Sequence, residues 1–195
     1  EGNRSLRVLD GLVFLFSAVD GVEPQSETNW RLADNYNVPR IGFVNKMDRQ
    51  GADFLNVCRQ VKEMLGSHAL PLQIPIGAED EFKGVVDLIN FKGIVWNEDD
   101  QGMTFKEVEI PADIIDEARE YRGQLLEAVA EFDESLMEKY FEDENSLTEA
   151  EILAALREAT ISGKVIPMMC GSAFKNKGVQ RLLDAIINLL PSPLD

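Results

Sequence analysis

Short, uninterrupted apolar runs recur along the chain and predict buried strands. Residues 12–16, 41–44 and 165–170 are runs of this kind. A run without polar alternation is typical of a strand that is covered on both faces, as in a parallel sheet. An amphipathic segment follows each run. The order therefore predicts an α/β fold in which a parallel sheet is built through right-handed crossovers.

The segments that follow the runs have apolar residues at helical spacing. The first, residues 26–37, follows Pro24, which suits an early helical position. The second runs from Asp53, a good N-cap, to Gly66, a good C-terminal stop. The third covers residues 178–190. The residues expected to face inward are Trp30, Ala33 and Tyr36 in the first helix, Phe54, Val57, Val61 and Leu65 in the second, and Val179, Leu182, Leu183, Ile186, Ile187 and Leu190 in the third.

The middle of the chain, residues 66–164, has a different texture. Four β-rich pieces, expected at residues 72–76, 85–89, 93–96 and 108–110, are separated by acidic turns, and helical patterns occupy residues 111–162. Thr148 followed by Glu151 has the spacing of a capping box, which predicts a helix start. These patterns predict an α+β subdomain that interrupts the parallel sheet.

The charge distribution supports the same division. The whole chain has a net charge of −16. Residues 66–164 hold 24 acidic and eight basic side chains, whereas the flanks hold 11 of each. We therefore divide the chain into residues 1–65, the central part of one domain, residues 66–164, an acidic insert, and residues 165–195, the last strand and helix of the same domain. The acidic insert is expected to repel bare nucleic acid.

Composition and cysteine content narrow the class of protein. Hydrophobic residues make up 45% and charged residues 28% of the chain, an ordinary globular balance. Cys58 and Cys170 lie far apart within apolar patterns, so we expect buried thiols in a reducing cytoplasm and no disulfide. His68 has no nearby Cys or His, so no metal site is expected. No apolar run approaches the roughly 18 residues of a membrane helix, and we expect a cytoplasmic protein with no membrane partner.

Polar residues follow two of the predicted strands, at the edge where parallel sheets bind ligands. Asn45-Lys46-Met47-Asp48 follows the second strand and fits the N-K-x-D pattern of GTPases. An aspartate at this place can accept two hydrogen bonds from guanine, from the ring N1–H and the 2-amino group. Adenine offers neither donor in that arrangement and would leave a desolvated charge unpaired. Asp48 is thus a candidate guanine-reading residue.

The other residues of this edge have complementary expected roles. Asn45 would join the loops, and Lys46 would lay its aliphatic stem along the base. Ser172 and Ala173, at the end of the last strand, would offer backbone N–H groups to the 6-oxo group of guanine. A turn followed by a helix start is the structural alternative for residues 45–48. The Ser-Ala pair at the end of the next core strand favours the nucleotide site.

The chain resembles the bacterial elongation factor G family of translational GTPases. The resemblance is carried by residues 22–54 and by Cys170-Gly171-Ser172-Ala173-Phe174-Lys175-Asn176-Lys177-Gly178-Val179-Gln180. It implies a P-loop-GTPase-type sheet with helices on both faces and an inserted subdomain. It also implies GTP and GDP as ligands, Mg²⁺ beside the phosphates, and a ribosome-bound factor of protein biosynthesis that uses GTP hydrolysis to drive translocation. Release factor 3 and the ribosome-protection factors are related alternatives, and a non-catalytic acidic interaction module is another, but residues 174–180 favour elongation factor G.

The sequence contains no G-x-x-x-x-G-K-[ST] phosphate loop. In the family that this chain resembles, that loop, the Mg²⁺-holding switch and the catalytic histidine segment lie upstream of the part represented here. We therefore expect no catalytic residue in this chain, and neither GTP hydrolysis nor tight GTP binding by the chain alone. Residues 4–7 resemble the helix that follows the histidine segment.

The insert carries a stripe of carboxylates along its predicted helix from residue 113 to residue 132. A solvated face is the simpler interpretation of such a stripe. A docking face for a basic partner is the alternative, and the resemblance implies that this partner is the ribosomal stalk protein. The candidate contact residues are Asp113, Asp116, Glu117, Glu120 and Glu127.

Overall fold

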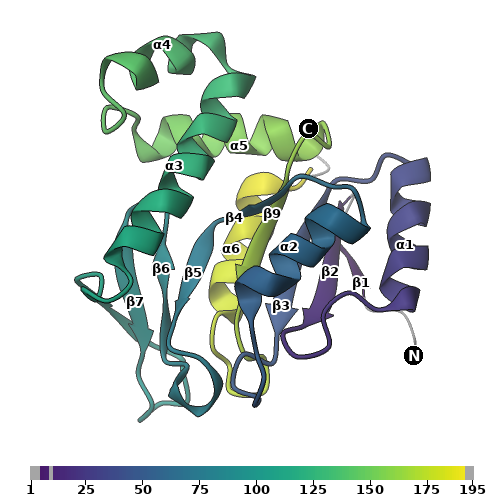
Figure 1. Ribbon diagram of the computed structural model, residues 1–195, viewed down its shortest axis with the longest axis vertical. Helices are drawn as coiled ribbons and strands as arrows, with labels where there is room; N and C mark the ends of the chain where they lie inside the picture. Colours follow the sequence, from purple (N-terminus) through teal and green to yellow (C-terminus); the bar gives the residue numbers. More distant parts are fainter. Residues whose placement is uncertain (1–4, 9–10, 192–195) are drawn as a thin grey trace.

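Two β-sheets and the helices that cover them make up the structure, a computed structural model that describes residues 5–8 and 11–191. The larger sheet has five strands in the order β1-β2-β3-β9-β4. They are β1 (Ser5–Val8), β2 (Gly11–Ser17), β3 (Arg40–Asn45), β4 (Ala69–Pro71) and β9 (Ile166–Cys170). The pairs β2–β3, β3–β9 and β9–β4 are parallel, and β1 is antiparallel to β2. This is the predicted parallel α/β sheet, with an antiparallel strand added at one edge (Figure 1).

Helices cover both faces of this sheet, as predicted. Helices α1 (Pro24–Asn35) and α2 (Phe54–Met64) share one apolar cluster with strand residues such as Phe14, Val44 and Met168. Helices α5 (Glu149–Ile161) and α6 (Val179–Leu189) share the other cluster with strand residues such as Ile41 and Phe43. The strands are buried on both sides, which explains why their sequences are continuous apolar runs.

The helix boundaries follow local signals in the sequence. Pro24 begins α1, and the Asp53 carboxylate accepts a hydrogen bond from the Asn56 N–H at the start of α2. Thr148 and Glu151 form the predicted capping box at the start of α5. Each of these signals satisfies backbone N–H groups that the first turn of a helix leaves free, or occupies a position where no N–H is needed.

The second sheet is antiparallel, in the order β5-β6-β7-β8. Its strands are β5 (Gln73–Ile76), β6 (Gly84–Asp87), β7 (Lys92–Trp96) and β8 (Phe105–Val108), and a short helix, η1 (Glu79–Glu81), lies between β5 and β6. Helices α3 (Ile115–Phe132) and α4 (Glu134–Glu142) follow, and α5 leads back into the larger sheet. In Figure 1, α3 runs from beside β6 and β7 toward α4 and α5, which lie past one end of the strands.

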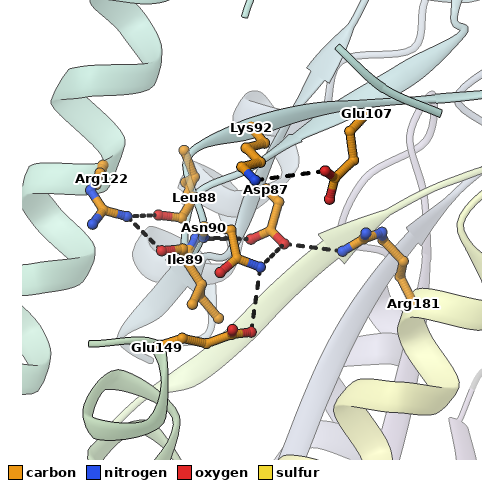
Figure 2. A network of polar contacts seen from close by, with 9 residues as sticks. All are labelled: Asp87, Leu88, Ile89, Asn90, Lys92, Glu107, Arg122, Glu149 and Arg181. Carbon is orange, nitrogen blue, oxygen red and sulfur yellow. Dashed lines mark hydrogen bonds and ion pairs between the residues drawn. The ribbon is translucent and has the colours of Figure 1, made fainter. Parts of the chain in front are cut away.

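A polar network ties the second sheet to α6 of the larger sheet (Figure 2). The buried carboxylate of Asp87, at the end of β6, lies 3.1 Å from the Arg181 guanidinium and accepts hydrogen bonds from the backbone N–H groups of Ile89 and Asn90. The Asn90 amide also reaches Glu149 at the start of α5, at 3.4 Å. Arg122 of α3 donates to the carbonyls of Leu88 and Ile89. The last residue of β6 and the turn after it are thus bonded to three helices.

Several sequence expectations differ from the structure. The expected helix at residues 4–7 is wrong for the described residues 5–8, which form β1; pairing there satisfies the N–H and C=O groups of the open edge of β2. Tyr36 is 78% exposed because it caps α1 at its end and does not continue the buried stripe. Leu183 and Ile187 are exposed because the buried stripe of α6 runs through Ala185, Ile186 and Leu189.

The boundary of the insert also needs adjustment. Residues 69–71, which the charge pattern grouped with the insert, form β4 and pair in parallel with β9 in the larger sheet. The last β-rich piece, expected at residues 108–110, is found at Phe105–Val108. We propose that the inserted part begins after Pro71, where the chain leaves β4. Among the described residues, none of the helices has the length and apolar character needed to cross a bilayer.

Candidate functional site

The two predicted recognition segments lie side by side because β3 and β9 are neighbours in the sheet. Val44 of β3 is paired with Cys170 of β9, so both strands end at the same edge. The Gly171 N–H donates to the Val44 carbonyl at 3.0 Å, and the Met47 N–H donates to the Gly171 carbonyl at 3.1 Å. The backbone ladder thus continues past both strands and holds the two loops together.

Side-chain hydrogen bonds then join the predicted site residues in pairs. The Ser172 hydroxyl donates to Asp48 Oδ1 at 2.8 Å. The Ala173 N–H donates to Asn45 Oδ1, also at 2.8 Å. Asn45 therefore joins the loops, as the sequence predicted, and Asp48 is oriented by a bond that the sequence analysis did not assign.

The expected donor role of the Ser172 and Ala173 N–H groups toward guanine stays a prediction. Both N–H groups have partners within the protein, because the Ser172 N–H donates to the Lys177 carbonyl at 2.9 Å and the Ala173 N–H to Asn45. Ser172 is buried, whereas Ala173 is exposed. The hydroxyl of Ser172 thus contributes to the site through Asp48, and Ala173 is the exposed residue of this pair.

Lys46 has a backbone conformation that its side chain normally disfavours. Its φ of +67° lies in the left-handed region, which costs a residue other than glycine about 1 kcal/mol. The neighbouring bonds hold it there: the Asn45 carbonyl accepts from the Ala18 N–H at 2.8 Å, and Met47 is fully buried. Strain of this kind persists where the surroundings fix the chain, and it is common at binding sites.

The loop from Ser172 to Lys177 is closed by a pair of backbone bonds. The Ser172 N–H and Lys177 N–H each donate to the other residue's carbonyl at 2.9 Å. Gly171 leaves room for this closure, since an added Cβ would lie 2.2 Å from the Lys177 carbonyl oxygen. Gly178 follows with a φ of +88° and starts α6.

Three residues near the site were not predicted as functional. Phe174 is 93% exposed and directly follows Ala173. Its position after the Ser172-Ala173 pair is the sequence signal that could have marked it as a candidate. Glu79 is bonded to backbone groups of Met47 and Gly51, and Lys177, within the Ser172–Lys177 loop, donates through its ammonium to distant residues. Sequence spacing alone carries no signal for such contacts.

The predicted acidic residues lie on one exposed helix and the turn before it. Asp116, Glu117, Glu120 and Glu127 are exposed positions of α3, and Asp113 lies in the turn before the helix begins at Ile115. One of them has a basic neighbour, because Arg119 lies 3.5 Å from Asp116. The acidic stripe is therefore open to solvent along the length of α3.

Both cysteines are buried and free, as predicted. Burial raises the pKa of each thiol well above the ordinary value, because a thiolate would be desolvated, and the other cysteine adds to this effect at Cys58. Thiols of this kind are unreactive core side chains.

Domains of the GTPase class share this helix-covered parallel sheet and this pair of joined loops, and comparison with known proteins places the chain among them. It belongs to the family described as the elongation factor Tu GTP binding domain, whose model matches residues 1–192. The chain is 74% identical to an elongation factor G from Cytophaga hutchinsonii and 60% identical to one from Amoebophilus asiaticus, over all 195 residues in both cases. It spans 28% of the length of each of these relatives.

A solved structure of a protein from Thermus thermophilus has the same fold. It superimposes with a TM-score of 0.82 at 29% sequence identity, over 94% of this chain and 27% of the other. The likeness covers the larger sheet together with the inserted part, since so little of the chain lies outside it.

Proposed function

We propose that this chain is the base-recognition part of the GTP-binding domain of a translation factor related to elongation factor G. The complete protein would bind GTP and GDP and use GTP hydrolysis to drive translocation on the ribosome. The observation that carries the proposal is the bond between Ser172 and Asp48, which presents a carboxylate at the sheet edge where two recognition loops meet. The elongation factor G relatives over the whole chain favour this task over release-factor recycling or ribosome protection.

Each residue of the site has a role in this proposal. Asp48 accepts hydrogen bonds from N1–H and the 2-amino group of guanine, and Ser172 fixes the orientation of the carboxylate. The Ala173 N–H is shared between Asn45 and the 6-oxo group, a three-centre arrangement that backbone donors commonly adopt. Lys46 covers the base with its aliphatic stem, and Phe174 offers exposed apolar surface beside it.

The phosphates and Mg²⁺ would be held by other parts of the complete protein. The sequence of this chain contains no phosphate-loop motif. Among residues 5–8 and 11–191, no three His, Cys, Asp or Glu side chains are grouped as a metal site. Mg²⁺, when bound beside the phosphates, would neutralise their charge, and this chain would contribute the selection of guanine.

Equilibrium binding tests the proposal. The complete gene product should bind GDP at least about 100-fold more tightly than ADP, because adenine leaves the Asp48 carboxylate unpaired. The 195-residue chain alone should bind GDP much more weakly, because phosphates supply much of the charge-assisted binding in such sites. Equal affinity of the complete product for GDP and ADP would contradict the proposal. Tight GDP binding by the chain alone would contradict the claim that other parts of the protein hold the phosphates.

The acidic stripe of α3 is proposed as a docking face for a basic surface of the ribosomal stalk protein. The support is the open row of carboxylates on Asp116, Glu117, Glu120 and Glu127, with Asp113 before it. Complementary charge of this kind accelerates association more than it raises affinity, and salt screens it.

Charge reversal tests this docking face. Glu117→Lys together with Glu120→Lys should slow stalk-dependent stimulation of GTP hydrolysis several-fold at low salt, and less at high salt. Glu63→Lys with Glu158→Lys makes the same change in charge at exposed positions of α2 and α5 and should leave the stimulation unchanged. If both double variants behave like the unaltered protein at every salt concentration, the stripe is only a solvated face.

A further inference from the structure

The turn between β5 and β6 of the second sheet contacts both loops of the base site. The Glu79 N–H donates to the Met47 carbonyl at 3.0 Å, and the Glu79 carboxylate accepts from the Gly51 N–H at 2.6 Å. Three residues later, the Phe82 carbonyl accepts from Lys177 Nζ at 3.0 Å. One short segment of the insert thus holds the loop that carries Asp48 and the loop that carries Ser172.

Lys177 is a buried cation with acceptors from two parts of the second sheet. The residue is 5% exposed, and its ammonium lies 3.0 Å from the Phe82 carbonyl and 2.9 Å from the Glu98 carboxylate. Its backbone is paired in both directions with Ser172. Lys177, which closes the loop of residues 172–177 (the recognition loop), therefore also anchors this loop to the insert.

The loop between β7 and β8 packs against the same recognition loop. Gly102 has a φ of +83°, and an added Cβ would lie 2.9 Å from the Asn176 carbonyl oxygen and 3.1 Å from that of Lys175. Glu98 belongs to this β7–β8 loop, and the hydrogen bond and charge of Lys177 hold the pKa of the Glu98 carboxyl below its usual range. The insert therefore contacts the recognition loop through backbone groups, at Gly102 and Phe82, and through the side chain of Glu98.

We infer that Lys177 and Glu79 are positioning residues of the guanine site, through which the inserted sheet fixes the two loops that read the base. The inference rests on the proposed function, since it takes these loops to bind guanine. Recognition by a carboxylate and a hydroxyl requires both to be held within a fraction of an ångström, and that precision comes from the groups packed behind them. Loss of either anchor would let the Ser172 loop and the Asp48 loop move apart.

Replacement of Lys177 in the complete gene product tests this inference, with GDP and inosine diphosphate as probes. Inosine diphosphate lacks the 2-amino group, so the ratio of the two dissociation constants reports how well Asp48 is placed. Lys177→Met keeps the length of the side chain but removes its donors. We expect the Kd for GDP to rise about tenfold and the ratio between the two nucleotides to shrink. A purely structural role would lower the melting temperature and leave both readouts unchanged, and that result would overturn the inference.

Matched variants keep the test decisive. Lys83→Met removes a lysine that is exposed and adjacent to Phe82, and it should leave GDP binding unchanged. If Lys177→Met does not fold, Glu79→Gln and Glu98→Gln decide instead, since each weakens one anchor at a partly or fully exposed side chain. Each should raise the Kd for GDP about threefold, and unchanged binding in both would overturn the inference. Absence of GDP preference in the unaltered protein is a different result, because it refutes the proposed function itself.

Discussion

The Ser172 hydroxyl lies 2.8 Å from one oxygen of Asp48, across two loops that are 124 residues apart in the sequence. This bond uses one carboxylate oxygen and thereby fixes the plane in which the carboxylate faces a ligand. A hydrogen bond to a charged acceptor contributes about 1.5–3 kcal/mol, more than one between neutral groups. The orientation of Asp48, the proposed base-reading residue, thus depends on a buried serine that does not itself need to touch the base.

Replacement of this serine should weaken guanine binding without unfolding the protein. Ser172→Ala removes the hydroxyl but keeps the small side chain that fits the buried position. We expect the Kd for GDP in the complete gene product to rise about tenfold, or ~1.4 kcal/mol, because Asp48 is no longer held. Ser162→Ala removes an exposed hydroxyl that bonds only to the nearby Ala159 carbonyl, among the bonds of the described residues, and serves as the control. Equal GDP affinity of the serine and alanine forms at position 172 would remove Ser172 from the site.

At the residue scale, the pattern predicted that the two loops lie at one edge of the sheet, but not the bonds that join them. Asn45, Lys46 and Asp48 could be predicted because they follow a buried strand in a known recognition pattern. The left-handed backbone of Lys46 and the bonds made by the Ser172 and Ala173 N–H groups could not, because they depend on how the two loops fold and pack together. The exposed Phe174 could have been found from its place after Ala173.

At the scale of elements, helix ends were predictable because their causes are local. Pro24, Asp53 and the Thr148–Glu151 box act within one turn of the chain, so their sequence spacing is sufficient. The strand β1 was not, because a strand is defined by the partner with which it pairs. The predicted position of β8 was wrong for the same reason, since the register of β8 is set by its pairing with β7.

The capping box at the start of α5 should make stability depend on pH. The pKa of Glu151 lies below its ordinary value of 4.5, first because Lys139 donates to the carboxylate at 2.8 Å and then because Thr148 does so through its backbone. A carboxyl with a lowered pKa stabilises the fold above the unfolded pKa. This stabilisation is lost as the pH falls through the lower, folded pKa.

Glu151→Gln should therefore lower the free energy of unfolding at neutral pH and have little effect well below pH 4.5. Urea unfolding of the unaltered chain and the variant at about pH 7 and about pH 3 measures the difference. Glu158→Gln, at an exposed position of the same helix, provides a control for the loss of one carboxylate. A difference for Glu151→Gln that stays constant across this pH range would contradict the assigned role of its charge.

At the scale of the whole molecule, the insert is packed as part of the domain. Each of the two apolar clusters contains residues from both the larger sheet and the second sheet, such as Phe43 with Val86 in one and Phe16 with Trp96 in the other. The Asp87–Arg181 pair and the Lys177 anchor cross the same boundary, and they join segments 94 and 95 residues apart. Composition and periodicity carry no record of such contacts. The architecture could be predicted from the sequence, but the contacts between the larger sheet and the insert could not.

The most direct test of the central claim is a change in base preference at Asp48. Asn presents one donor and one acceptor where Asp presents two acceptors, so Asp48→Asn should pair with xanthine, which offers N1–H and a 2-oxo group. In the complete gene product, GDP affinity should fall on the order of 10³-fold, while xanthosine diphosphate should become the better ligand. Asp113→Asn, an exposed carboxylate before α3, should leave GDP binding unchanged. If Asp48→Asn binds GDP as tightly as the unaltered protein and does not favour xanthosine diphosphate, Asp48 does not read the base and the account fails.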